Sequence, residues 1–176
     1  MASTEIYAGV DIGGTKVAVA LGTAAGQVLA AGSFAIATER ETGSPLEGSP
    51  GCVLERTAQL METLAAECGA EPAALGVGLP GLVDANAGTA EFLPNLPGKW
   101  KGARVAEILR ERTGKDVYIL NDARLATLGE YRFGAGRTTA SMLLVTVGTG
   151  IGGGLILDGQ LRLGLHGAAG DLRLDP

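Results

Sequence analysis

The sequence predicts an α/β protein made of two halves, because one pattern of strands and glycines occurs in it twice. The first copy surrounds Asp11-Ile12-Gly13-Gly14-Thr15-Lys16, and the second surrounds residues 147–154. In each copy an apolar strand enters a glycine-rich turn and continues as another strand. Glycine accounts for 29 of 176 residues, but the glycines gather at strand ends, as in a turn-rich α/β domain and not a disordered chain.

Composition narrows the range of partners. A hydrophobic content of 46% is enough for a substantial core. The net charge of −5 argues against a nucleic-acid partner, and an aromatic content of 4% argues against stacking on single strands. No signal-peptide pattern or apolar stretch of membrane-spanning length occurs, so we expect a cytoplasmic protein without a membrane partner.

The first half is expected to begin with three strands within residues 5–36, followed by a polar loop. Ser49 and Pro50 then predict the start of a helix, with Ser49 as its cap and Pro50 in its first turn. Apolar residues at helical spacing extend this helix to Cys68, and Gly69 is placed to end it. The two cysteines both fall in this helix, so they supply neither a disulfide framework nor a complete zinc site.

The middle of the chain alternates strands and helices. A short buried strand at 75–79 stops at Pro80-Gly81, and residues 82–100 are expected to form a long irregular loop. The predicted elements that follow are a helix at 102–112, a strand at 117–120 and a helix at 123–133.

The second half repeats the opening order with strands at 140–147, 151–157 and 160–163, and then the repeat breaks off. We therefore expect a complete N-terminal lobe over residues 1–121 and the start of an incomplete second lobe over residues 122–176.

The second glycine turn has a competing interpretation. Gly148, Gly150 and Gly153 match the G-x-G-x-x-G fingerprint of dinucleotide-binding proteins. That fingerprint requires a helix after the glycines, whereas residues 155–157 predict a strand that ends in the Asp158-Gly159 turn. The context therefore argues against a nucleotide-dependent dehydrogenase.

The first turn adds charged side chains to its glycines. Asp11 ends a strand, where its carboxylate suits Mg²⁺ directly or through water, and Lys16 is suited to phosphate oxygens. The alternative is a plain hairpin in which Asp11 caps the turn and Lys16 is solvated. Two such turns in one chain predict two halves that hold the phosphates of one nucleotide.

Asp122 is the best candidate for a general base. It follows a predicted strand, at the sheet edge where α/β proteins place ligands. A carboxylate at that position can accept the proton of a hydroxyl group as its oxygen attacks phosphorus. The alternative is that Asn121-Asp122 only caps the helix that follows.

Five motifs in this order resemble the ROK family of bacterial glucokinases, N-acetylhexosamine kinases and sugar-responsive repressors. The resemblance extends from about Ile6 to Leu172 and is carried by Asp11–Lys16, residues 78–84, Pro94-Asn95-Leu96, Asn121-Asp122-Ala123 and residues 148–154. It implies the actin-like ATPase (ribonuclease H-like) fold and transfer of the γ-phosphate of ATP to a hexose hydroxyl.

The resemblance also assigns roles to single residues. Asp122 would be the catalytic base, and Asp11 would hold Mg²⁺. The residues expected to bind ATP are Asp11, Gly13, Gly14, Thr15 and Lys16 in the first turn and Gly148, Thr149 and Gly150 in the second. Those expected to bind the sugar are Gly81, Asn95, Asn121, Asp122 and Asp171.

The chain departs from the family pattern near its C-terminus. Asp171 stands where the family usually has a sugar-binding Glu, and Leu174 stands where the family has a zinc-binding His. The cysteines that complete the structural zinc site of the family are absent from this sequence, and His166 does not occupy the zinc position.

Three functions are consistent with the sequence. The leading one is an ATP-dependent hexose kinase, with glucose as the preferred substrate and a homodimer as the expected assembly. The second is a non-catalytic member that binds sugar or phosphate or associates with another subunit. A sugar-responsive regulator is the third, but a strand begins at Ile6, before any helix-turn-helix could form.

Overall fold

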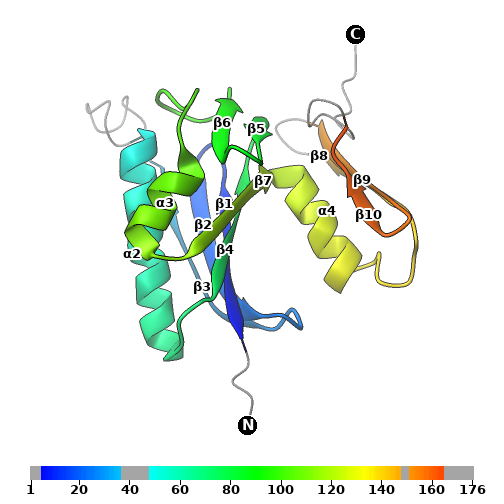
Figure 1. The fold of residues 1–176 in the computed structure, drawn as a ribbon, viewed down its shortest axis with the longest axis horizontal. Helices are drawn as coiled ribbons and strands as arrows, with labels where there is room; N and C mark the ends of the chain where they lie inside the picture. The colour runs from blue at the N-terminus through cyan, green and yellow to red at the C-terminus, as the bar shows by residue number, and fades with distance from the viewer. Residues whose placement is uncertain (1–4, 37–47, 148–150, 165–176) are drawn as a thin grey trace. The chain divides into compact units, whose positions relative to one another are not determined.

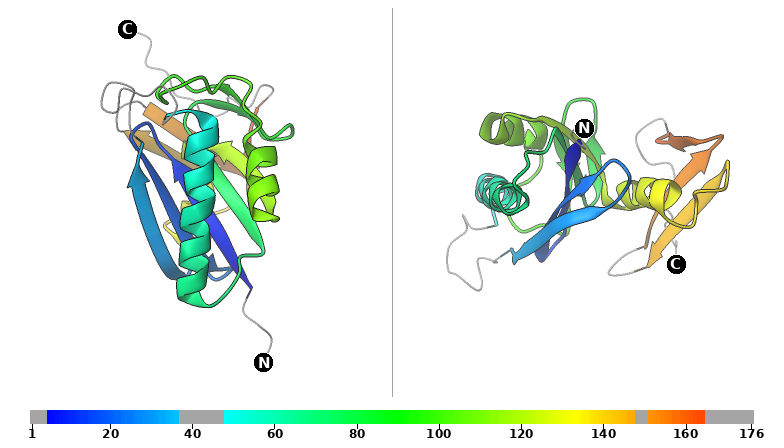
Figure 2. Two further views of the ribbon diagram at one scale, coloured as in Figure 1. Left: turned by 90° about the vertical axis from the view of Figure 1, so that its left-hand side faces the viewer. Right: turned by 90° about the horizontal axis from the view of Figure 1, so that it is seen from below.

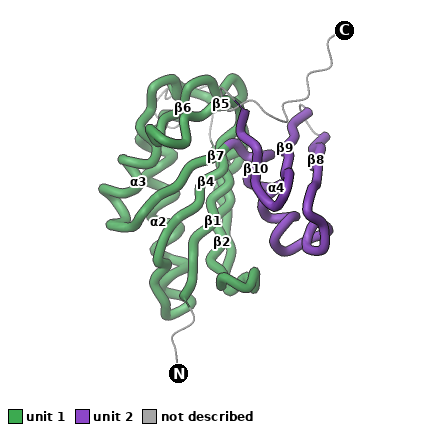
Figure 3. Tube along the Cα trace, turned by 45° about the vertical axis from the view of Figure 1, so that its right-hand side comes forward, with its two compact units in different colours: residues 1–120 green, residues 121–176 purple. Residues whose placement is uncertain are grey.

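A computed structural model describes residues 5–36, 48–147 and 151–164, and the chain forms two compact units in it (Figure 3). Unit 1 comprises Met1–Leu120, and unit 2 comprises Asn121–Pro176. The assignment of the two halves as one complete and one incomplete lobe stays a prediction.

Unit 1 is built on a mixed sheet. β1 pairs antiparallel with β2 and parallel with β4, and β2 pairs antiparallel with β3. The order β3-β2-β1-β4-β7 makes this a five-stranded sheet in the described part of the chain. Its strands are β1 (Ile6–Ile12), β2 (Lys16–Thr23), β3 (Val28–Ala35), β4 (Ala74–Leu79) and β7 (Asp116–Asn121).

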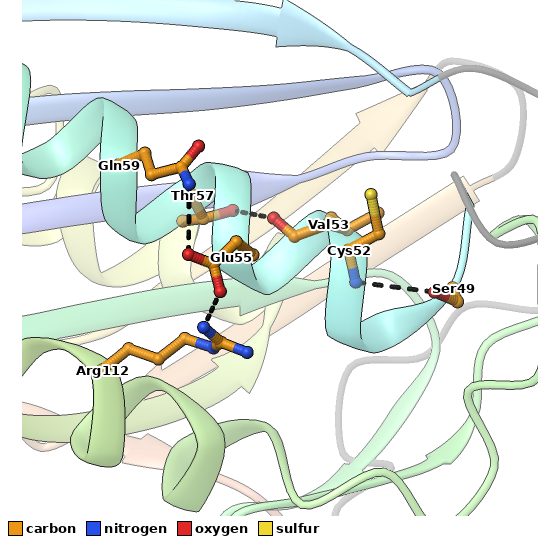
Figure 4. A network of polar contacts seen from close by, with 7 residues as sticks. All are labelled: Ser49, Cys52, Val53, Glu55, Thr57, Gln59 and Arg112. Carbon is orange, nitrogen blue, oxygen red and sulfur yellow. Dashed lines mark hydrogen bonds and ion pairs between the residues drawn. The ribbon is translucent and has the colours of Figure 1, made fainter.

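Helices α2 (Pro50–Cys68) and α3 (Val105–Thr113) lie over one face of this sheet, and the two helices also contact each other (Figures 1 and 2). α2 begins and ends as the sequence predicts. The Oγ of Ser49 accepts a hydrogen bond from the N–H of Cys52 at 3.5 Å, and Gly69 ends the helix with a φ of 64°. Glu55 on α2 accepts a hydrogen bond from Gln59 and pairs with Arg112 on α3 (Figure 4).

Strand alternation places the core of unit 1 under these helices. Alternate residues of β1 are buried, and the residues between them are exposed. In β2, buried residues likewise alternate with more exposed ones. β4 is buried along most of its length, as expected of a central strand. The largest fully buried side chains on these three strands are Ile12, Val17, Val19, Leu21, Leu75, Val77 and Leu79.

The expectation of an irregular loop at 82–100 is wrong for its first half. β5 (Leu82–Asp84) and β6 (Thr89–Phe92) form an antiparallel hairpin with a register shift between Leu82 and Val83. Asp84 stabilises the turn because its Oδ1 accepts the N–H of Asn86 and of Ala87, each at 2.9 Å.

The remainder of that segment is held by Trp100. Its side chain is 2% exposed, and its indole N–H donates to the carbonyl oxygen of Pro97 at 2.8 Å and of Gly48 at 3.3 Å. The bond to Pro97 closes the end of the loop on itself, and the bond to Gly48 connects it to the residues just before α2.

Unit 2 contains helix α4 (Asp122–Phe133) and a small antiparallel sheet. The strands β8 (Met142–Val147), β9 (Ile151–Leu157) and β10 (Gln160–Arg162) lie in the order β10-β9-β8. α4 packs against β8 and β9. A Cβ on Gly154 would overlap Thr127 of α4, and a Cβ on Gly152 would lie 2.9 Å from that of Ala123. Glycine at these two positions therefore lets the helix approach the sheet closely.

No helix among the described residues is both long and apolar enough to cross a membrane.

Candidate functional site

The first glycine turn is held in place by backbone hydrogen bonds. The N–H of Gly13 donates to the carbonyl oxygen of Lys16 at 2.9 Å, and the N–H of Ile36 donates to that of Thr15 at 2.8 Å. Ile12 and Val17, on either side of the turn, are fully buried. The side chains of Thr15 and Lys16 are exposed, so a rigid turn presents a hydroxyl and an ammonium group to the solvent.

Asp11 projects from the sheet face opposite the core. Its neighbours Val10 and Ile12 are 2% and 0% exposed, and strand alternation turns Asp11 the other way. In the register of the sheet it lies between Ala18 of β2 and Gly78 of β4. Because β1 and β4 are parallel, Asp11 lies near the edge at which both strands end.

Gly14 lies against the backbone of Asn95. A Cβ on Gly14 would be 2.6 Å from the carbonyl oxygen of Asn95, which is closer than real Cβ atoms approach an oxygen. The turn and the 93–97 segment are therefore in direct contact, and only glycine permits this contact at position 14.

Gly81 is fixed in a similar way at the end of β4. It has a φ of 85°, and a Cβ there would overlap the carbonyl oxygen of Phe92 and lie 3.3 Å from the Cδ of Pro94. Since Asn95 follows Pro94, the structure brings the first turn, Gly81 and Asn95 together at one edge of unit 1.

The predicted base stands where β7 gives way to α4. Asn121 is the N-cap of α4, and its Oδ1 accepts the N–H of Arg124 at 3.3 Å. Asp122 is the first helical residue, and its Oδ1 accepts the N–H of Ala123 at 2.8 Å. Asn121 thus performs the capping role that was the alternative interpretation for this pair. Asn121 is 5% exposed and Asp122 is half-buried.

Arg124 is a polar residue that sequence reasoning missed. It is 2% exposed although it lies on the first turn of α4, two residues after Asp122. An arginine on a helix is usually solvated, and nothing in the local sequence signals that this one is buried.

The second turn is described only at its flanks. Val147 pairs with Ile151 across it, and β9 follows the turn as a strand. The prediction that no helix follows these glycines is therefore confirmed. Gly148, Thr149 and Gly150 lie outside the described residues, as do Asp171, His166 and Leu174.

No cluster of three or more His, Cys, Asp or Glu side chains suited to a metal ion occurs within residues 5–36, 48–147 and 151–164. Asp11 is a single exposed carboxylate. One carboxylate suits Mg²⁺, which keeps several waters and takes further ligands from substrate phosphates.

Comparison of the sequence with models of protein families identifies the family of this chain. The model of the ROK family matches residues 7–172. The chain belongs to the ROK family. This confirms the resemblance of the five motifs, and the solved members that share the architecture have the actin-like ATPase fold.

Several ROK proteins are similar over nearly the whole of this chain. A glucokinase of Thermotoga maritima is 37% identical over 165 residues, which are 93% of this chain and 48% of that protein. The ROK hexokinase of Thermus thermophilus has a TM-score of 0.82 and 33% identity, covering 97% of this chain and 54% of that one.

A ROK family glucokinase of Streptomyces griseus, solved in complex with glucose and AMPPNP, has a TM-score of 0.83 and 31% identity. The match covers 97% of this chain and 51% of that chain. This ROK chain thus spans about half the length of the curated relatives it matches.

Proposed function

We propose that this chain carries part of the active site of an ATP-dependent sugar kinase, with glucose as the first substrate to test. The observation that carries the proposal is the packing of Gly14 against Asn95. This contact joins the turn predicted to bind phosphate to the residue predicted to bind sugar. A Cβ on Gly14 would lie only 2.6 Å from the carbonyl oxygen of Asn95. Relatives named glucokinase and a neighbour solved with glucose and AMPPNP support the same function.

The proposed reaction is an in-line transfer of the γ-phosphoryl group. A carboxylate oxygen of Asp122 accepts the proton of the sugar hydroxyl while the hydroxyl oxygen forms its bond to phosphorus. The bond between phosphorus and the oxygen bridging to the β-phosphate breaks, and ADP leaves with the electron pair of that bond. The hydrogen bond from Ala123 to Oδ1 fixes the orientation of this carboxylate.

The other residues would bind and orient the substrates. Lys16, Thr15 and the backbone of the first turn would hold phosphate oxygens, together with Gly148, Thr149 and Gly150. Mg²⁺, held through Asp11, would neutralise charge on the phosphates. On the sugar side, Gly81, Asn95, Asn121 and Asp171 would contact hydroxyl groups. The homodimer and the cytoplasmic location stay predictions.

The test is a coupled assay of ADP release with ATP, Mg²⁺ and a panel of hexoses. We expect sugar-dependent turnover, fastest with glucose, and a loss of about 10²–10⁴-fold in kcat for Asp122→Asn. This substitution keeps an oxygen that accepts the Ala123 N–H, so α4 should keep its first turn. Asp116→Asn, an exposed change at the start of β7, is the matched control and should leave kcat unchanged.

Two results would contradict the proposal. Turnover that survives Asp122→Asn within a factor of about two would remove Asp122 as the base. A folded chain that turns over none of the hexoses would show that it is no enzyme by itself and would favour the non-catalytic alternative.

A further inference from the structure

Residues 93–100 follow β6 and form neither a helix nor a strand. Three side chains of this segment, Leu93, Leu96 and Trp100, are buried and belong to the hydrophobic core of unit 1. Asn95 is exposed between the first two of them. No helix or strand pairing determines the backbone of this segment, so its conformation depends on a few anchoring contacts.

Trp100 anchors the segment with a single donor. An indole has one N–H, and that of Trp100 donates to the carbonyl oxygen of Pro97 at 2.8 Å and of Gly48 at 3.3 Å. Gly48 is buried, and a Cβ there would lie 3.0 Å from the Cβ and the Cγ of Pro97. A Cβ on Gly98 would lie 2.6 Å from the carbonyl oxygen of Gly48. The segment is therefore closely packed on the residues before α2, and the indole joins the two backbones.

Asn95 lies between this anchor and the first glycine turn. Its backbone packs against Gly14, and Leu96 alone separates it from Pro97 in the sequence. The backbone between them is stiff, because the rings of Pro94 and Pro97 fix their own φ and restrict the residues that precede them. A displacement of the Pro97 carbonyl group is therefore transmitted to Asn95.

We infer that Trp100 is a positioning residue of the candidate site: its indole N–H holds the carbonyl oxygen of Pro97 and thereby keeps Asn95 against the first turn. The side chain of Trp100 is 2% exposed, so it acts through Asn95 and does not contact the sugar itself. This role rests on the proposed function in one respect, because it requires that Asn95 binds the sugar. The affinity for the sugar then depends on a hydrogen bond in the core of unit 1.

Two changes at Trp100 remove the N–H donor. Trp100→Phe does so genetically. Trp100 is the one tryptophan of the sequence, so the benzothiophene analogue of tryptophan, in which sulfur replaces the N–H, can be incorporated at this position alone and keeps the ring packing. Both changes should raise the KM for the hexose, and its Kd measured by calorimetry, about tenfold, as expected for the loss of one hydrogen bond. The KM for ATP and kcat should stay within about twofold.

Thr57→Val is the matched control for a merely structural effect. Thr57 is 0% exposed, and its Oγ1 donates to the carbonyl oxygen of Val53 within α2 at 2.7 Å. This substitution also removes a buried side-chain hydrogen bond, so it should lower stability as Trp100→Phe does. It should leave the KM for the hexose unchanged, since a smaller amount of folded enzyme lowers kcat only. In an Asn95→Ala background, Trp100→Phe should have no further effect on this KM, because both changes act through one residue.

Hydrogen exchange gives a measurement that needs no sugar. The N–H of Leu96 donates to the carbonyl oxygen of Leu93, and its exchange should be about tenfold faster in Trp100→Phe than in Thr57→Val. Equal exchange of Leu96 in these two variants would overturn the positioning role, as would an unaltered KM and Kd for the hexose.

The remaining outcomes are also decisive. If Trp100→Phe does not fold, the same measurements on the benzothiophene analogue decide. An unchanged chain that binds no hexose would overturn the proposed function and with it the role of Trp100 toward the sugar. The exchange of Leu96 would then still show whether the indole holds the segment, so the two failures are distinguishable.

Discussion

At the scale of single residues, the glycines in and near the candidate site are of two kinds, which differ in whether a side chain would have room. Gly14 and Gly81 lie where a carbonyl oxygen of a neighbouring segment occupies the space of a side chain. Gly9 lies two residues before Asp11 on β1, and a Cβ there would meet nothing within 4 Å. The first kind holds the site together, and the second leaves open space over the sheet. The sequence shows glycine at all three positions without distinguishing the two kinds.

This difference predicts opposite effects for the same substitution. Gly14→Ala should lower the free energy of unfolding by about 1–3 kcal/mol, because the new methyl group forces the Asn95 backbone away from the turn. Gly9→Ala should be neutral or should raise it by up to about 1 kcal/mol, because alanine reduces the entropy of the unfolded chain. Urea denaturation of both variants measures the two values. Equal losses would show that the turn does not depend on contact with Asn95.

Asn121 and Asp122 show where inference from a motif stops at this scale. Their sequence fits both a helix cap and a catalytic pair, and of these two roles the structure shows the cap. The cap hydrogen bond belongs to Asn121, whereas Asp122 stands one position into α4. The Oδ1 of Asp122 also accepts the N–H of Ala123, and its role as a base stays a proposal. Sequence alone did not divide the pair, since aspartate and asparagine cap helices about equally well.

At the scale of elements, prediction succeeded where local chemistry determines structure. Ser49, Pro50 and Gly69 fixed both ends of α2, because a cap side chain and a left-handed glycine act within one helical turn. The β5–β6 hairpin was missed because β5 has three residues and the pairing contains a register shift. The hairpin also depends on contacts with segments distant in the sequence. One of them is the hydrogen bond from the N–H of Ala90 in β6 to the carbonyl oxygen of Ala103, at 3.0 Å.

The strand predicted at 151–157 is confirmed as β9, and Gly152 and Gly154 lie within it on the side of α4. This predicts that Gly154→Ala separates the helix from the sheet, since Thr127 is 0% exposed and its Oγ1 donates to the carbonyl oxygen of Ala123 at 2.7 Å. We expect a loss of about 1–3 kcal/mol in the free energy of unfolding.

The control for this prediction lies on the helix itself. Gly129 is an interior residue of α4 whose Cβ would meet nothing within 4 Å. Gly129→Ala should therefore stabilise the chain by about 0.5–1 kcal/mol. Thermal unfolding followed by circular dichroism compares the two variants. A stable Gly154→Ala variant with an unchanged midpoint would mean that α4 does not depend on close approach to β9.

At the scale of the whole molecule, the two units differ in how much apolar surface they bury. The hydrophobic core cluster of the described residues runs from Ile6 to Ile119 and lies entirely within unit 1. Among the described residues of unit 2, the buried apolar side chains are Ala123 and Ile156. Burial of apolar side chains is the main favourable term in folding, so unit 1 should be the more stable of the two.

Native-state hydrogen exchange on the full chain tests this difference. The amides of β1 and β4, which are central strands of the five-stranded sheet and pair on both sides, should exchange only through global unfolding. The amides of β8, at an edge of the unit 2 sheet in the described part of the chain, should exchange through local opening that costs much less free energy. Denaturant should therefore accelerate exchange steeply in β1 and β4 and weakly in β8, because local opening exposes little new surface. Equal protection and equal denaturant dependence in β1 and β8 would show that the chain unfolds as one cooperative unit.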